Sequence, residues 1–197
     1  DEAVRRACAD VLRGHASTRE REPDLGVFWP GVWAITGTPR RLIDLGCGLG
    51  PLALPWMRLA REAAYVAVDV DGRPLSVVAA FLDLVGQPHE VRELDLVGTA
   101  PEMPADVALL LKLVPTLDQQ EPTAAARLLG TLDARHAVVS FPRRSLGGRG
   151  KGMEATYRER LARLEQECGR ITGVAEASVP SELVFVLVLD PLERSGG

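Results

Sequence analysis

The chain has 197 residues, of which 46% are hydrophobic and 25% charged, so it is neither disordered nor of low complexity. Its length predicts one domain, or one domain with a small appendage. The formal net charge of −4 argues against a uniformly basic nucleic-acid binder but allows a local basic patch. The purest apolar run covers only residues 183–189, so no membrane span is expected.

Three cysteines and three histidines are scattered along the sequence, without the C-x-x-C spacing of many metal sites. We therefore expect no metal site and no disulfide framework. A reducing, intracellular setting is the simplest interpretation of this cysteine usage, and we expect a monomeric, cytoplasmic protein.

The expected secondary structure begins with a short helix over residues 1–14, where apolar side chains recur at helical spacing. Residues 15–39 are expected to be irregular, because glycine, proline and charged residues are frequent there. From residue 41 onward, strands and helices alternate. Strands are expected at residues 42–45, 65–70, 90–94, 106–114 and 137–141. Helices are expected at residues 52–64, 75–85, 123–132 and 153–168.

The C-terminal segments 174–179 and 183–189 flank Pro180-Ser181-Glu182 and predict a closing hairpin. Alternating strands and helices indicate a parallel sheet covered on both faces, and the hairpin adds one antiparallel strand near its edge. This combination is typical of an α/β class I methyltransferase fold, which is Rossmann-like, with a mostly parallel seven-stranded sheet and an antiparallel edge hairpin. Ligands of such sheets bind beyond the carboxyl ends of the strands, where we expect the functional residues.

The first candidate site is the glycine-rich segment from Asp44 to Gly50, which follows a predicted strand and opens a predicted helix. Gly46 and Gly48 would let the backbone turn sharply and approach a ligand closely. The spacing is G-x-G-x-G rather than the G-x-G-x-x-G of pyrophosphate-binding turns, which disfavours NAD or FAD and favours S-adenosylmethionine. A tight turn that binds no ligand is the alternative.

Asp69 ends the second predicted strand about twenty residues after the glycine segment, where an acid can bind both hydroxyls of a ribose. A solvated loop acid is the alternative, which this position and spacing make the weaker interpretation. Asp95 and Leu96 end the third predicted strand, where the same fold usually contacts adenine. For Asp95, the alternative that it is only a turn residue without a ligand is nearly as well supported as a contact with adenine.

The segment from Phe141 to Gly152 contains four cations and no acid: Arg143, Arg144, Arg149 and Lys151. Its glycines would let it follow a surface, and its cations suit phosphates, so we favour a nucleic-acid contact over a merely solvated loop.

Several further segments are distinctive: residues 15–21, 46–57, 111–115 with Gln119-Gln120, 140–142, 145–148 and 151–153. Among them, the His-Ala-Ser-Thr and Ser-Leu-Gly-Gly motifs are much more specific than the glycine segment. Together these segments resemble one family, the aminoglycoside-resistance 16S ribosomal RNA guanine-N7 methyltransferases.

The resemblance implies an enzyme that transfers a methyl group from S-adenosylmethionine to N7 of a guanine in 16S ribosomal RNA of the 30S subunit, and thereby blocks aminoglycosides. It implies that Arg21 holds the methionine carboxylate of the cofactor, that Asp69 binds the ribose and that Lys112 and Arg149 act on the RNA side. The residues expected at the cofactor are His15, Ala16, Ser17, Arg21, Gly46, Gly48, Asp69, Asp95, Leu96, Leu111 and Gln120. The residues expected at the RNA are Lys112, Arg143, Arg144, Arg149 and Lys151.

The family also carries a helical N-terminal subdomain that docks on the ribosome, whereas only fourteen residues precede His15. We therefore expect residues 1–39 to be a remnant of that subdomain and residues 40–197 to be the cofactor-binding methyltransferase domain. The short N-terminal part and the acidic net charge leave two alternatives open. One is a methyltransferase that acts on another RNA or on a small molecule, and the other is a non-catalytic homologue that binds the cofactor or RNA.

Overall fold

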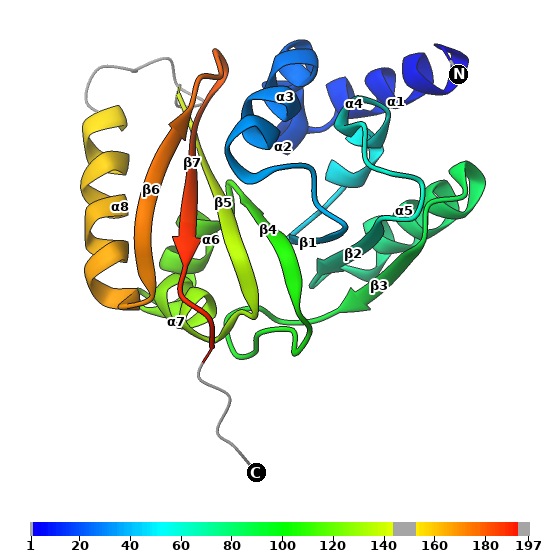
Figure 1. Cartoon of the computed structure of the whole chain (residues 1–197). Helices are drawn as coiled ribbons and strands as arrows, with labels where there is room; N and C mark the ends of the chain where they lie inside the picture. Colours follow the sequence, from blue (N-terminus) through cyan, green and yellow to red (C-terminus); the bar gives the residue numbers. More distant parts are fainter. Residues whose placement is uncertain (1, 144–152, 193–197) are drawn as a thin grey trace.

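The computed structural model describes residues 2–143 and 153–192, and within them seven strands form one sheet in the order β3-β2-β1-β4-β5-β7-β6 (Figure 1). Strands β1 to β5 are parallel, and β7 runs antiparallel to both β5 and β6. The predicted mostly parallel seven-stranded sheet with an antiparallel hairpin at its edge is thus confirmed. The strands are β1 (Arg41–Leu45), β2 (Ala64–Asp69), β3 (His89–Glu93), β4 (Ala105–Leu111), β5 (Ala134–Pro142), β6 (Ile171–Ala177) and β7 (Glu182–Leu189).

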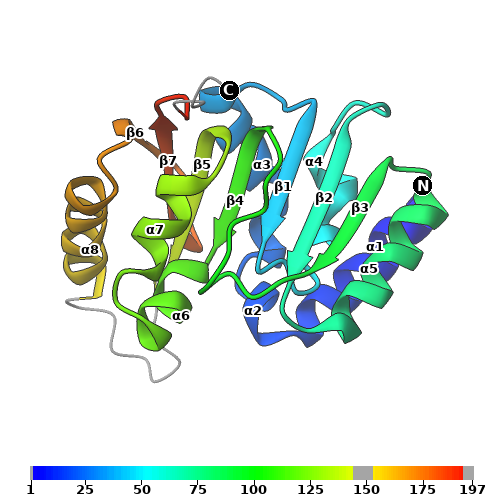
Figure 2. The ribbon, with the colours of Figure 1, turned by 90° about the horizontal axis from the view of Figure 1, so that it is seen from below.

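Helices cover both faces of the sheet (Figures 1 and 2). Helices α6, α7 and α8 cover one face, and α1, α3 and α5 cover the other. The α-helices of the described residues are α1 (Glu2–Gly14), α2 (Ala16–Arg19), α3 (Leu25–Thr36), α4 (Leu54–Met57), α5 (Gly72–Val85), α6 (Leu113–Gln120), α7 (Ala124–Thr131) and α8 (Met153–Cys168). Two short 3-10 helices, η1 (Glu22–Asp24) and η2 (Gly50–Ala53), precede α3 and α4.

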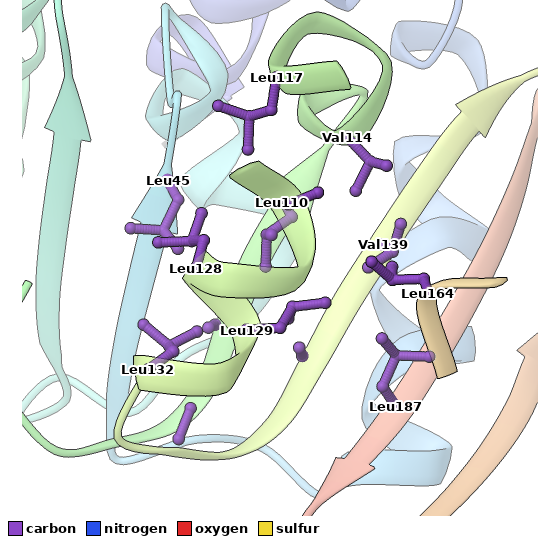
Figure 3. Packing of buried hydrophobic residues seen from close by; sticks show 14 of the residues in the cluster. Leu45, Leu110, Val114, Leu117, Leu128, Leu129, Leu132, Val139, Leu164 and Leu187 are labelled. Carbon is purple, nitrogen blue, oxygen red and sulfur yellow. The ribbon is translucent and has the colours of Figure 1, made fainter. Parts of the chain in front are cut away.

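The alternation of side chains along each strand explains the two apolar layers. On β4, Ala108 and Leu110 belong to the layer under α6, α7 and α8, whereas Val107 and Leu109 belong to the opposite layer. In the first layer, Leu128 and Leu129 of α7 and Leu132, which directly follows it, pack against Leu45, Leu110 and Val139 of the sheet (Figure 3). Both faces are therefore buried, as a parallel sheet requires.

The expectation of an irregular segment over residues 15–39 was wrong, because α3 occupies residues 25–36. Its buried side chains are Leu25, Phe28, Trp29 and Val32, which have the i, i+3, i+4, i+7 spacing of a helix stripe. Pro30 lies on the exposed side, as does Gly26 four residues earlier, so the carbonyl group that proline leaves unpaired can reach water. Burial of the aromatic stripe outweighs the cost of proline inside the helix.

The helix expected over residues 52–64 is also shorter than predicted, because α4 ends at Met57. Arg58 adopts a left-handed conformation with φ of 53°, which ends the helix. The indole nitrogen of Trp33 donates a hydrogen bond of 2.7 Å to the carbonyl oxygen of Met57, so α3 satisfies one of the last carbonyl groups of α4.

The strand expected over residues 106–114 ends at Leu111, and the helix α6 begins two residues later. Lys112 makes the change of direction with φ of 59°. The apolar run therefore contains both the end of a strand and the first turn of a helix, which hydrophobicity alone does not separate.

Candidate functional site

The glycine turn after β1 lies at the carboxyl end of the central strands, where the fold predicts a ligand site. Gly46 and Gly48 have φ values of 63° and 48°, a region that favours glycine, as expected for this turn. A Cβ atom on Gly46 would lie 2.8 Å from Cδ1 of Leu113 in α6. The turn therefore needs glycine at position 46 both for its backbone angle and for the close approach of α6.

A cavity of about 400 Å³ lies next to this turn, between the loops that follow β1, β2, β3 and β4 and the helix α6. It brings together seven of the expected cofactor residues, Ser17, Gly46, Asp69, Asp95, Leu96, Leu111 and Gln120, as well as Lys112. These residues come from positions up to 103 apart in the chain, between Ser17 and Gln120. The cavity is therefore built by the tertiary fold around the predicted glycine and acidic residues.

Helix α6 supplies a wall of the cavity that the sequence interpretation missed. Leu113, Thr116, Leu117 and Gln120 all line the cavity and are spaced as one face of a helix. Only Gln120 was expected there. The i, i+3, i+4, i+7 spacing was the signal, but it was hidden because residues 106–114 read as one apolar strand.

Asp69 is held in place by two backbone groups. Its Oδ2 accepts a hydrogen bond of 2.7 Å from the N–H of Gly48, and its Oδ1 accepts one of 3.0 Å from the N–H of Asp71. A carboxylate has about four lone-pair sites, so both oxygens can still accept hydrogen bonds from a diol. The side chain of Asp71 accepts from the N–H of Arg73 and caps α5, as expected for a residue at a helix start.

Asp44, the first residue of the predicted glycine-rich segment, is buried just before the glycine turn. The hydroxyl of Tyr65 donates a hydrogen bond of 2.7 Å to its Oδ2. Burial raises the pKa of Asp44 to about 7, although Tyr65 and the charge of Arg21 oppose the rise. The pair joins β1 to β2 directly below the turn.

Asp95 shapes the wall after β3. Its Oδ1 accepts a hydrogen bond of 2.9 Å from the N–H of Val97, which is the geometry of an Asx turn. Leu96 between them is buried in the apolar layer, yet it also lines the cavity. The turn therefore presents an apolar side chain and a carboxylate to the same space.

Arg21 lies outside the lining of the cavity and is buried against β7. Its Nη2 is 2.9 Å from Oε2 of Glu182, and its guanidinium lies over the ring of Phe28. The Nε of Arg21 has no hydrogen-bond partner among the described residues. Glu182 is fully buried, and sequence reasoning missed it because the residue is 161 positions from Arg21.

Lys112 joins the same charge cluster at the rim of the cavity. Its ammonium lies 2.7 Å from Oε2 of Glu20, 3.3 Å from the carbonyl oxygen of Ser17 and 3.3 Å from Oε1 of Glu182. Burial by itself would raise the pKa of Glu182, but the charges of Arg21 and Lys112 outweigh it and the net pKa is lowered. Two cations therefore keep a fully buried carboxylate ionised.

Of the remaining predicted residues, those that the structure describes do not line the cavity. His15 and Ala16 are exposed at the start of α2, next to Ser17, and Gly48 donates a hydrogen bond to Asp69, which does line the cavity. Arg143 is half-buried and donates to the carbonyl oxygen of Glu182 and to Glu154. Arg144, Arg149 and Lys151 lie outside the described residues.

A second cleft, of about 580 Å³, lies at the opposite ends of the strands, where β1, β2, β4 and β5 begin. Its charged lining combines Arg40, Arg41 and Arg135 with Glu62, Asp106 and Asp133. It contains neither the glycine turn nor Asp69, so it is not the site that the fold predicts.

The described residues contain no group of three or more His, Cys, Asp or Glu side chains that could hold a metal ion. Within the same residues, no helix is both long and apolar enough to cross a membrane.

The chain matches the family model described as "Ribosomal RNA methyltransferase (FmrO)" over residues 1–186. It is 37% identical over 187 residues to a 16S rRNA (guanine(1405)-N(7))-methyltransferase of Micromonospora rosea, covering 95% of this chain and 68% of that protein. An enzyme of the same name from Frankia casuarinae is 40% identical over 187 residues, with 94% and 65% covered.

Solved structures agree with this similarity. The 16S rRNA methyltransferase RmtF, crystallised with S-adenosyl-L-homocysteine, has a TM-score of 0.79 and 34% identity, covering 93% of this chain and 69% of that chain. The 16S rRNA methylase ArmA has a TM-score of 0.73 and 26% identity, covering 93% and 91%.

Proposed function

Because this chain belongs to the FmrO family of ribosomal RNA methyltransferases, we propose that it transfers a methyl group from S-adenosylmethionine to N7 of a guanine in 16S ribosomal RNA. The observation that carries the proposal is the cavity in which the glycine turn, Asp69 and Asp95 converge. The chain spans about two thirds of the length of the Micromonospora relative, so the target base and the ribosomal context are part of the proposal.

The cavity fits the chemical groups of S-adenosylmethionine. Asp69 presents acceptors for the two ribose hydroxyls, and the glycine turn leaves room for the nucleoside above the backbone. Leu96 and Leu117 offer apolar surface for the adenine ring, with Asp95 at its edge as a hydrogen-bond acceptor. Ser17 and Lys112 lie at the rim, where the amino-acid end belongs in this assignment.

Arg21 is proposed to hold the methionine carboxylate, as the resemblance implies. Its ion pair with Glu182 uses Nη2, and its Nε is buried without a partner among the described residues, so one of its donors is unsatisfied. His15, Ala16 and Gly48 belong to the proposed site through their neighbours Ser17 and Asp69. In this proposal residues 40–197 form the cofactor-binding domain and residues 1–39 contribute part of its rim.

Methyl transfer to guanine N7 needs little from the protein beyond alignment. The N7 atom carries no proton and has an available lone pair, so the attack on the sulfonium methyl requires no general base. Within this proposal, the protein holds the base in line with the methyl group and excludes water. A guanine that is stacked in RNA would first have to leave its stack.

The RNA-side residues are proposed to be Lys112, Arg143, Arg144, Arg149 and Lys151. Lys112 supports this assignment because its ammonium lies at the rim of the cavity, close to the place where a target base would enter. Cations at such a rim suit the phosphates that flank the base.

The decisive experiment measures transfer of labelled methyl from S-adenosylmethionine to 30S subunits and maps the product to N7 of one guanine. The matched control is the Asp69→Ala variant, which should bind the cofactor weakly. Transfer to free RNA or to a small molecule without 30S subunits would select a different substrate. Tight binding of S-adenosylhomocysteine without transfer to any of these acceptors would indicate a non-catalytic homologue. A host that expresses the full-length gene should also become less sensitive to kanamycin.

A further inference from the structure

Arg127 of α7 connects the two walls that enclose one end of the cavity. Its Nη1 and Nη2 lie 2.6 and 2.9 Å from the two carboxylate oxygens of Glu121, and its Nη2 also donates to the carbonyl oxygen of Val97. Glu121 directly follows the last residue of α6, and Val97 belongs to the segment after β3. One guanidinium therefore joins the helix wall to the wall that contains Asp95 and Leu96.

The first wall is the end of α6. Glu121 directly follows this helix, and its backbone N–H donates to the carbonyl oxygen of Leu117. Both oxygens of its carboxylate accept from Arg127, and Oε1 also accepts a hydrogen bond of 3.2 Å from the hydroxyl of Thr123. Because Leu117 and Gln120 line the cavity just before this point, the position of Glu121 is coupled to the position of that lining.

The second wall is the segment from Leu94 to Val97, which has no regular secondary structure. Leu96 is buried in the apolar layer, and Val97 is partly buried and packs against the same layer. A cleft of about 300 Å³ borders both residues and is lined also by Thr99, Glu102 and Arg127. Open space therefore borders this wall on one side. The hydrogen bond from Arg127 crosses this region and holds the carbonyl group of Val97.

We propose that Arg127 is a positioning residue, which sets the separation of these two walls and thereby the affinity and selectivity of the cavity for adenine. The inference rests on the proposed function, because it takes the cavity to bind S-adenosylmethionine with its adenine between Leu96 and Leu117. Arginine suits this role because its planar fork bonds two acceptors on different segments at once, which a lysine ammonium cannot do with the same geometry.

An ordinary surface ion pair is the competing explanation, because the side chains of Arg127 and Glu121 are 44% and 42% exposed. The chain offers a matched control in Arg158 of α8, which makes a similar two-bond pair with Glu176 of β6 at 2.8 and 3.0 Å. Those side chains are 47% and 36% exposed, and neither residue lines the cavity. Arg158 also lies over the ring of Phe185, whereas Arg127 donates to the carbonyl oxygen of Val97. Of the two arginines, Arg127 is the one with a partner that lines the cavity.

The experiment measures the dissociation constants of S-adenosylhomocysteine and 5′-methylthioadenosine for the wild type, Arg127→Ala, Arg127→Lys and Arg158→Ala by calorimetry. We expect Arg127→Ala to weaken both ligands by the same factor, about tenfold, because both share the adenosine end. Arg127→Lys should lose most of the same affinity. Arg158→Ala should stay within about twofold of the wild type.

Two further measurements distinguish a role of Arg127 in positioning the cavity walls from a role in the overall stability of the protein. The preference for S-adenosylhomocysteine over its inosine analogue should fall in Arg127→Ala. A wall that is no longer held in position would distinguish less well between the hydrogen-bonding edges of adenine and hypoxanthine. The KM for RNA should stay unchanged while the KM for S-adenosylmethionine rises. A merely structural role would lower the melting temperature without changing this preference.

The outcomes are decisive in each case. If wild-type protein does not bind S-adenosylhomocysteine, the proposed function fails before the variants are compared. If the wild type binds and Arg127→Ala binds equally well, or if Arg158→Ala is weakened as much, the inference about Arg127 is overturned. Weakening of S-adenosylhomocysteine without weakening of 5′-methylthioadenosine would also overturn it. Should Arg127→Ala not fold, Arg127→Lys and Glu121→Gln decide by the same measurements.

Discussion

The Oδ2 of Asp69 accepts a hydrogen bond of 2.7 Å from the backbone N–H of Gly48, which ties the loop after β2 to the glycine turn after β1. The acid that is proposed to bind the ribose and the turn that is proposed to lie beneath the nucleoside are therefore one connected unit. Such preorganisation reduces the ordering that a ligand must impose when it binds.

We expect Asp69→Ala to weaken S-adenosylhomocysteine binding by about 1–3 kcal/mol, because ligand hydroxyls and the N–H of Gly48 lose their acceptor. Asp69→Asn is the informative companion, since its amide oxygen can still accept from Gly48. It should bind with intermediate affinity in calorimetry. An unchanged affinity of Asp69→Ala would refute the assignment of Asp69 to the ribose.

Gly46→Ala should distort the cavity. The new Cβ would lie 2.8 Å from Cδ1 of Leu113. The alanine would also have to adopt the left-handed backbone conformation of Gly46, which costs an L-residue roughly 1–2 kcal/mol. We expect lower stability in urea unfolding and weaker binding of S-adenosylhomocysteine. Gly26→Ala is the control, because Gly26 lies in α3 and a Cβ there meets nothing within 4 Å. Equal binding by both variants would contradict the role of Gly46.

Glu182→Gln should destabilise the protein by roughly 3–5 kcal/mol, because Arg21 would remain buried without its counter-charge. Glu176→Gln removes one member of an exposed ion pair and should cost no more than about 1 kcal/mol. Urea unfolding of both variants compares the two values. If Glu182→Gln and Glu176→Gln unfolded at similar urea concentrations, the buried charge cluster would contribute little to stability.

Asp44 should make the folded state less stable as the pH rises. Its folded pKa of about 7 lies above the ordinary value of 3.8, so between these values the folded state binds more protons than the unfolded state. From pH 4.5 to 7.5 this effect should lower the free energy of unfolding by an amount on the order of 3 kcal/mol.

The Asp44→Asn variant isolates that effect, because the amide can still accept a hydrogen bond from Tyr65 but does not ionise. His136 acts in the opposite direction, since burial lowers its pKa and stability is lost as the pH falls through the ordinary value of 6.5. Subtracting the pH profile of the variant from that of the wild type removes this contribution. If the two profiles are parallel, the carboxyl of Asp44 does not titrate in this range.

Arg149→Ala should spare cofactor binding and lower methylation of RNA, because its cation is proposed to contact phosphate. The control is Arg163→Ala, which changes an exposed arginine of α8. Filter binding of 30S subunits and calorimetry of S-adenosylhomocysteine separate the two effects. Loss of both activities in Arg149→Ala would point to misfolding and would count against a specific RNA contact.

The spacing of apolar residues along the sequence was sufficient to predict the position of much of the secondary structure. The helix α8 has the bounds expected from its apolar spacing, and β1, β2 and β3 differ from expectation by one residue at each end or less. It failed at α3, where Pro30 and two glycines interrupt a stripe of large apolar side chains that tertiary packing turns into a helix. It failed again at α6, because an apolar run does not show where a strand ends and a helix begins.

The sequence by itself determined the alternation of strands and helices, the glycine turn at Gly46 and the acid at Asp69, because each depends on neighbouring residues and on the spacing along one or two elements. Only the tertiary structure decided that Glu182 faces Arg21 and that Arg127 reaches Val97. These contacts join segments that are 161 and 30 residues apart, and their geometry depends on how helices pack on the sheet. A charged residue shows no local pattern that names its partner, since any opposite charge that the fold brings within hydrogen-bond distance can fill that role.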